Sequence, residues 1–220
     1  MTTAIAYSVR ALDRHAHLFQ VILTIAEPAA DQVVSLPVWI PGSYLVREFS
    51  KTLQNLRANQ GEKPVEMRQR DKRSWQATCT TSRPLVLTYE VYALDNSVRT
   101  AWLDASRGFF NGTSLFLQVE GQECMPHALT LQADQTLVGW QIATGLTPLK
   151  IDKNGFGRYL AANYDELVDC PVEMGSFWSD SFVAGGLEHR FVVAGAPPSF
   201  DGARLLKDTQ AICEAEISFW

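Results

Sequence analysis

The sequence predicts a mainly β protein, with an N-terminal β-sandwich or open β-saddle and a helix at its C-terminal end. Short runs of alternating apolar and polar residues are separated by turn signals about every 8–12 residues, which is typical of such folds. No sustained helical period occurs before residue 200. From about Gly202 the apolar residues recur with a helical period instead.

The clearest strands lie in the first half of the chain. In residues 17–25, Phe19, Val21, Leu23 and Ile25 occupy every second position, a period that favours a half-buried strand. Residues 85–94 alternate in the same way. Further strands are expected at residues 4–9, 33–40, 53–58, 65–69, 74–80, 114–119, 128–132, 139–143, 158–163, 181–184 and 188–194. Residues 164–171 are expected to form a solvated, acidic loop at a domain boundary.

The C-terminal helix carries an apolar stripe. Leu205, Ile212 and Phe219 are spaced seven residues apart, and a neighbouring column runs beside them. Asp201 or Ser199 is the expected N-cap. No glycine or basic last turn ends the helix before Trp220, so we expect the native chain to continue into a further domain.

Residues 36–51, LPVWIPGSYLVREFSK, form the most distinctive stretch of the chain. Pro37 and Pro41 each remove a backbone donor, so a regular central strand cannot pass through both. The Pro41-Gly42 pair predicts a fixed turn. Two interpretations stay open, a core-lining turn and one wall of a binding cleft. The stretch also carries three aromatic residues, namely Trp39, Tyr44 and Phe49.

Composition narrows the possible partners. The 220 residues have a net charge of −5 and no long basic run, so nucleic acid is not an expected partner. No window of about 18 apolar residues predicts a membrane span. Residues 1–20 lack the apolar core of a signal peptide, and cytoplasmic residence is the default expectation. The four cysteines contain no CxxC pair and are expected to be buried, reduced thiols: Cys79, Cys124, Cys170 and Cys213.

Motifs for catalysis or metal binding are not found. The sequence contains no His-Glu-x-x-His, no Gly-x-Ser-x-Gly and no phosphate-binding glycine loop. His15 and His17 can share one face of a strand, but no third ligand lies near them in sequence. We therefore expect no catalytic residue and no metal ligand in this chain. Residues 185–190, GGLEHR, are similar to a glycine-rich substrate-binding segment of zinc aminopeptidases, but are expected to form a β-turn that enters a strand.

Two non-enzymatic functions stay open on this evidence. Six tryptophans are compatible with a carbohydrate-binding β-sandwich module, although most of them are expected to lie in the core. A structural or interaction domain is the other possibility, because an apolar C-terminal helix offers a surface to a partner.

Three stretches, taken in order, carry a resemblance to a known family. They are residues 36–51, residues 107–116 (RGFFNGTSLF) and residues 165–175 (DELVDCPVEMG). Together they resemble the N-terminal region of glycyl-aminopeptidase-type zinc metallopeptidases, and the match covers essentially the whole chain. The resemblance implies a β-sandwich or saddle domain at residues 1–171. It also implies that residues 172–220 are the first strands and first helix of a truncated, thermolysin-like α/β catalytic domain, with a PDZ domain further on.

The resemblance also implies how the whole protein works. Its zinc would be held by a His-Glu-x-x-His helix and a downstream glutamate, none of which is present here, so this chain is expected to bind no metal and to be inactive alone. The region would pack on its own catalytic domain and shape the cleft of an enzyme that hydrolyses N-terminal residues from peptides. Relatives supply a glutamine near the substrate amine, but residues 100–112 contain none. The expected substrate-binding residues are Tyr44, Arg107, Phe110, Asn111 and Gly112.

Overall fold

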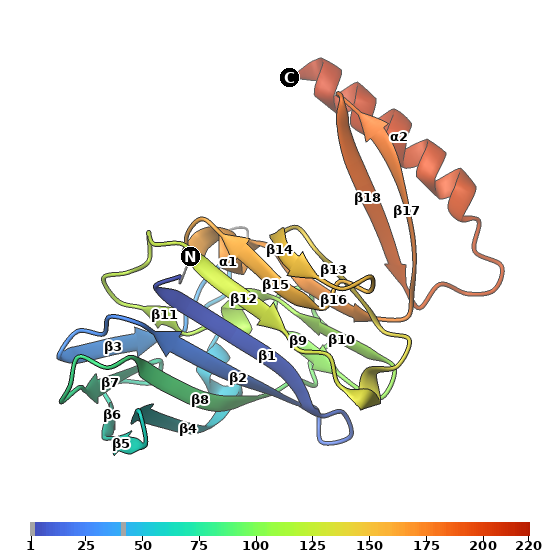
Figure 1. The fold of residues 1–220 in the computed structure, drawn as a ribbon. Helices are drawn as coiled ribbons and strands as arrows, with labels where there is room; N and C mark the ends of the chain where they lie inside the picture. Colours follow the sequence, from blue (N-terminus) through green and yellow to red (C-terminus); the bar gives the residue numbers. More distant parts are fainter. Residues whose placement is uncertain (1–2, 41–42) are drawn as a thin grey trace. The chain divides into compact units, whose positions relative to one another are not determined.

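The computed structural model describes residues 3–40 and 43–220 and is built mostly of β-strands (Figure 1). It divides into two compact units, Met1–Met174 and Gly175–Trp220, which are described separately below. The turn predicted at Pro41-Gly42 lies outside the described residues. The mainly β class is confirmed.

The first unit is organised around an eight-stranded sheet with the order β14-β15-β12-β1-β2-β8-β4-β5 (Figure 1). β1 pairs antiparallel with β2 and parallel with β12, where Ile5 faces His127. The alternation in β2 buries Phe19, Val21 and Leu23 completely, as the sequence predicts. The strands are β1 (Ile5–Asp13), β2 (Leu18–Ile25), β4 (Leu53–Gln60), β5 (Lys63–Val65), β8 (Leu85–Tyr92), β12 (His127–Leu131), β14 (Thr147–Ile151) and β15 (Gly157–Ala161).

Two four-stranded sheets complete the first unit. One has the order β13-β16-β10-β9, and the other has the order β11-β3-β7-β6. A single cluster of buried apolar side chains joins all three sheets, with Phe19, Val34 and Phe110 each contributed by a different sheet. The strands are β13 (Gln141–Thr144), β16 (Val172–Gly175), β10 (Arg107–Phe110), β9 (Ala101–Leu103), β11 (Gln118–Val119), β3 (Asp31–Ser35), β7 (Ser74–Thr78) and β6 (Met67–Gln69).

The strand predicted for residues 114–119 is wrong over most of its length. A 3₁₀ turn, η2 (Gly112–Ser114), is followed by an irregular segment, and only Gln118–Val119 form a strand. Residues 115–117 are nevertheless completely buried. Their carbonyl groups accept hydrogen bonds from tyrosine hydroxyl groups, so the segment does not need a neighbouring strand to satisfy its backbone.

The strand predicted for residues 33–40 is also too long, because β3 ends at Ser35, two residues before Pro37. The loop predicted for residues 164–171 is in fact a helix, α1 (Tyr164–Asp169). Asn163 Oδ1 accepts from the Glu166 amide at 2.8 Å, and the Glu166 carboxylate accepts from the Ala162 amide at 2.6 Å. This reciprocal capping stabilises a helix that is too short to show a helical period in the sequence.

The second unit is a hairpin, β17 (Phe177–Ala184) and β18 (Leu187–Ala194), with helix α2 (Gly202–Phe219) beside β17. Gly185 and Gly186 have φ angles of 59° and 79° and form the hairpin turn, which confirms the predicted turn into a strand. Asp201 caps α2 by accepting from the Arg204 amide at 3.0 Å. The predicted stripe is largely exposed at its end, because Phe219 is 76% accessible to solvent.

The four cysteines are all free, but the expected burial is wrong. Cys124 is exposed, and the other three are only partly buried. Burial raises the pKa of the Cys79 and Cys170 thiols above the ordinary value, which favours their neutral form.

Candidate functional site

Two adjoining depressions in the first unit lie between residues 45–52 and residues 92–101, and together they are called the cleft. Their volumes are about 470 and 370 Å³. The first is lined by Leu45, Val46, Arg47, Glu48, Phe49, Lys51, Asp95 and Thr100. The second is lined by Phe49, Lys51, Thr52, Tyr92, Leu94, Asp95, Thr100, Ala101 and Ser114.

The first wall of the cleft is formed by residues 43–52. The Arg47 amide donates to the Val38 carbonyl at 2.6 Å, and Arg47 Nε donates to Ser43 Oγ at 3.2 Å. A 3₁₀ turn, η1 (Phe49–Thr52), then places the buried Phe49 ring at the base of this wall. These contacts fix the loop while its apolar side chains, including Leu45 and Val46, point outward and stay exposed.

The second wall is formed by residues 92–101, which are held by hydrogen bonds within the loop. The Asp95 amide donates to the Ala101 carbonyl at 3.0 Å, and Thr100 Oγ1 donates to the Asp95 carbonyl at 2.9 Å. The Asn111 amide donates to the Thr100 carbonyl at 2.9 Å, which ties this wall to the floor of the cleft.

Opposite charges line the cleft. Lys51 and Asp95 both border the two depressions and are exposed. The Asp95 carboxylate makes no hydrogen bond or ion pair with any residue that the structure describes. At the rim, Lys72 forms an ion pair of 2.8 Å with Glu48, and this contact holds the pKa of Glu48 below its ordinary value. Asp95 and Lys51 are therefore available to a ligand, beside Arg47 and Glu48, which also line the first depression.

Ser114 of the η2 turn forms part of the floor of the cleft. Asn111 Oδ1 accepts from the Thr113 amide at 3.1 Å, and Ser114 Oγ donates to the Asn111 carbonyl at 2.7 Å. Gly112 packs directly against α1, where a Cβ atom would lie 2.8 Å from the Cα atom of Val168. The floor is thus fixed by packing that leaves no space for a side chain at Gly112.

The structure separates the predicted substrate-binding residues. Tyr44 is fully exposed beside Leu45 of the first wall. Phe110 is completely buried, with ring centroids 5.5 Å from Phe19 and 5.7 Å from Phe116, and Gly112 is buried as well. Neither Phe110 nor Gly112 is among the residues that line the two depressions.

The remaining two predicted residues are engaged in polar contacts. The Asn111 side chain caps η2, and the Arg107 side chain is turned toward Glu173. Sequence reasoning missed Lys51, Tyr92 and Asp95 as parts of a site. The only local signal was their position just after an aromatic loop or at the end of the strongest strand.

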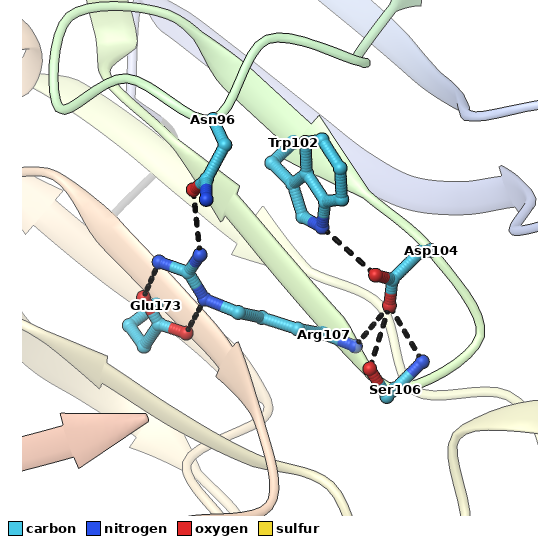
Figure 2. A network of polar contacts seen from close by, with 6 residues as sticks. All are labelled: Asn96, Trp102, Asp104, Ser106, Arg107 and Glu173. Atoms are coloured by element: carbon cyan, nitrogen blue, oxygen red, sulfur yellow. Dashed lines mark hydrogen bonds and ion pairs between the residues drawn. The ribbon is translucent and has the colours of Figure 1, made fainter. Parts of the chain in front are cut away.

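The Arg107 side chain joins three segments of the first unit (Figure 2). Its Nε and Nη2 atoms donate to the two carboxylate oxygens of Glu173 at 2.7 and 2.9 Å. Its Nη1 atom donates to Asn96 Oδ1 at 3.0 Å. The ion pair is partly buried and raises the pKa of Arg107, so the guanidinium is charged at any physiological pH.

Asp104 fixes the backbone from which Arg107 projects (Figure 2). Asp104 Oδ1 accepts from the Ser106 amide at 2.7 Å and from the Arg107 amide at 2.8 Å. Asp104 Oδ2 accepts from Trp102 Nε1 at 3.0 Å. Burial alone would raise the pKa of Asp104, but these hydrogen bonds hold it below the ordinary value.

No metal site accompanies the cleft. Within residues 3–40 and 43–220, no three His, Cys, Asp or Glu side chains are grouped so that they could hold a metal ion. His17 Nδ1 lies 2.5 Å from the Leu103 carbonyl and His15 is exposed, so the two histidines do not form a chelating pair. The zinc ligands that the family resemblance implies are therefore not supplied by the described residues.

Other possible functions find little support in the described part of the chain. In the first unit, Trp39 is the one described tryptophan that is more than half exposed. Neither described helix combines the length and the hydropathy that crossing a bilayer requires.

Comparisons with known proteins agree with the fold. The model of the Peptidase M61 N-terminal domain matches residues 6–176. The structure of an aminopeptidase N family protein from Idiomarina loihiensis is 41% identical, with a TM-score of 0.93 over 97% of this chain. Leukotriene A4 hydrolase from Saccharomyces cerevisiae is 10% identical, with a TM-score of 0.54 over 98% of this chain, and so shares the fold alone.

The chain spans only part of these proteins, since it covers 36% of the Idiomarina protein and 33% of the yeast hydrolase. No curated protein matches it. The family model nonetheless matches most of the chain, and a relative of high identity covers nearly all of it. The chain therefore belongs to the Peptidase M61 N-terminal domain family.

Proposed function

We propose that this chain is the non-catalytic N-terminal region of a zinc-dependent aminopeptidase that hydrolyses N-terminal residues from peptides. Membership of a peptidase family supports this proposal, as does the 41% identity to an aminopeptidase N family protein. In the whole enzyme a separate catalytic domain would hold the zinc, which polarises the scissile carbonyl and activates water. The residues of this chain would bind, orient and shield the substrate.

The cleft is the observation that carries this proposal. Its exposed apolar side chains, such as Leu45 and Tyr92, are suited to packing against the catalytic domain or a peptide side chain. Asp95 would attract the α-ammonium group of a peptide, and Lys51 would attract a carboxylate. A cleft of this composition fits a small zwitterionic peptide better than a nucleic acid or a sugar.

The full-length protein encoded by the gene provides the test. We expect the purified protein to contain about one zinc ion and to release the N-terminal residue of short peptides. Chelation should abolish the hydrolysis and added zinc should restore it. Matched peptides with an acetylated N-terminus should resist cleavage, because they lack the ammonium group. A full-length protein that holds no zinc and hydrolyses no peptide would refute the proposal.

The contribution of the cleft is tested separately. Replacing Tyr92 by Ala should weaken peptide binding or the packing of the catalytic domain, and thus raise KM or lower the zinc-dependent activity. The control replaces Val138 by Ala, because Val138 is 85% exposed and does not line the cleft. A Tyr92→Ala enzyme with unchanged kinetics would leave the cleft without a role in catalysis.

A further inference from the structure

All three nitrogen atoms of the Arg107 guanidinium already donate to protein oxygens (Figure 2). Two bonds go to Glu173 in a parallel fork, and the third goes to Asn96. A bidentate fork of this kind fixes orientation as well as position, because both partners are planar. Three of the five N–H groups of the guanidinium thus bind protein oxygens, and the side chain holds protein segments together.

The two partners of Arg107, Glu173 and Asn96, lie in different parts of the first unit, one in a sheet and the other beside the cleft. Glu173 belongs to β16, which neighbours β10 in the four-stranded sheet. Asn96 precedes Ser97 in the second wall and directly follows Asp95, the unpaired carboxylate of the cleft. Its bond to Arg107 is the one side-chain contact recorded for Asn96 among the described residues. The sheet therefore holds this wall of the cleft through Arg107.

Arg107 is itself held rigidly. Asp104 binds its amide, and the guanidinium carbon lies 5.5 Å from the centroid of the Phe109 ring. The Arg107 and Glu173 side chains are only 30% and 16% exposed, so solvent competes less for this pair than for an ion pair at the surface. A rigid support of this type can set the position of residues 92–101, whose other hydrogen bonds are mostly within the loop.

We propose that Arg107 is a positioning residue, which fixes the Asp95-bearing wall of the cleft by joining Asn96 to Glu173. The expected effect on KM rests on the proposed aminopeptidase function. The support of the loop by Arg107 does not depend on that function. Loss of the contact lets the loop move, so Asp95 samples more positions and binds the substrate amine less well. The chemical step takes place elsewhere in the enzyme and keeps its rate.

The experiment compares three variants of the full-length protein. Asn96→Ala removes the hydrogen bond from Arg107 to the loop and leaves the ion pair with Glu173. Arg107→Lys removes the pair of parallel hydrogen bonds to Glu173. Glu173→Gln keeps the shape of the side chain but removes its charge. Gln122→Ala is the matched control, because it removes an exposed side-chain bond to the Glu27 carbonyl outside the cleft. The measurements are KM and kcat for a short peptide, and amide hydrogen exchange across residues 95–101.

We expect Asn96→Ala to raise KM about threefold or more while kcat changes less than about twofold. Amides of residues 95–101 should exchange faster, while those of β1 and β2 keep their protection. Arg107→Lys and Glu173→Gln should show the same pattern with larger effects, and the control should match the wild type. Normal exchange in residues 95–101 of both Asn96→Ala and Arg107→Lys would overturn the inference, as would faster exchange with an unchanged KM in an active enzyme.

The two proposals fail separately. A protein without aminopeptidase activity refutes the proposed function, while hydrogen exchange still decides whether Arg107 supports the loop.

Discussion

The hydroxyl group of Tyr7 donates a hydrogen bond of 2.7 Å to the main-chain oxygen of Leu117, 110 residues further along the chain. Tyr89 makes the same contact with Leu115, and Tyr164 makes it with Phe116, each at 2.7 Å. Three consecutive carbonyls of a buried, irregular segment are thus satisfied by three side chains. Burial raises the pKa of each of these tyrosines, so their hydroxyl groups stay protonated and act as donors.

Removing one of these hydroxyl groups should destabilise the first unit. Tyr164→Phe leaves the Phe116 carbonyl buried without a donor, and we expect the free energy of unfolding to fall by about 1–3 kcal/mol. Urea unfolding followed by fluorescence measures this change. Tyr44→Phe is the control, since Tyr44 is fully exposed and its loss of a hydroxyl group should have no effect. Equal stability of the two variants would show that the bond to Phe116 contributes nothing.

Gly112 should tolerate no side chain. A Cβ atom at this position would lie 2.8 Å from Val168 Cα and 3.0 Å from the Leu167 carbonyl oxygen, and backbone atoms cannot move aside without shifting α1. We expect Gly112→Ala to lower the free energy of unfolding by about 1–3 kcal/mol. Gly145→Ala is the matched control, because the nearest atom there is the Cys170 sulfur at the end of a side chain. Thermal unfolding of both variants checks the difference.

His127 should make stability depend on pH. It is completely buried between the rings of Tyr7 and Tyr164, and its Nδ1 atom lies 2.6 Å from the Met125 carbonyl. Burial lowers the pKa of His127 below its ordinary value of about 6.5, although the Met125 contact and the charge of Glu123 partly oppose this shift. Its Nε2 atom has no partner in the described structure. Folding therefore favours the neutral form of this imidazole.

The lower pKa of His127 in the folded state means that the free energy of unfolding should fall as the pH is lowered. Above about pH 6.5 the histidine is neutral in both states and its contribution to stability is complete. As the pH falls, the unfolded chain takes up a proton more readily, so the free energy of unfolding should decrease by up to about 1.4 kcal/mol per pH unit. Urea unfolding at pH 7.5 and 5.5 measures this loss. His127→Phe should show a smaller loss over the same interval, and an equal loss would assign the effect to other groups.

Asp95 should contribute to substrate binding in the full-length enzyme. Asp95→Asn removes the negative charge and keeps the shape, so we expect KM for a peptide with a free amine to rise a few-fold, a range consistent with an exposed charge. Added salt should reduce the difference from the wild type, because it screens this attraction. Glu62→Gln removes a charge from an exposed turn that does not line the cleft, and serves as the control. An unchanged KM for the Asp95→Asn enzyme would show that Asp95 does not contribute to substrate binding.

Much of the fold could be predicted from the sequence because the direction of a strand side chain is a local property. The alternation in residues 18–25 therefore indicated which side chains lie in the core, including Phe19 and Val21. The path of residues 115–117 could not be predicted in this way. It depends on hydroxyl groups that are remote in sequence, and an apolar run is equally compatible with a strand.

The candidate site was harder to predict than the fold. Phe110 and Gly112 belong to residues 107–116, one of the stretches that carry the family resemblance. The structure shows that both residues are tightly packed in the interior. The sequence singles out Arg107 as a site residue, but only the structure shows that it binds Glu173 and Asn96. The position of Asp95 just after the strongest strand is a weak signal, because its place in a cleft depends on residues 45–52 folding beside it.

The parallel pairing of β1 with β12 also affects the folding of the protein during its synthesis. β1 can pair with β2 as soon as both have left the ribosome, but its other edge waits for residues 127–131. At bacterial or eukaryotic rates of translation this delay is roughly ten seconds. During that time an apolar strand edge is open to pairing with another nascent chain.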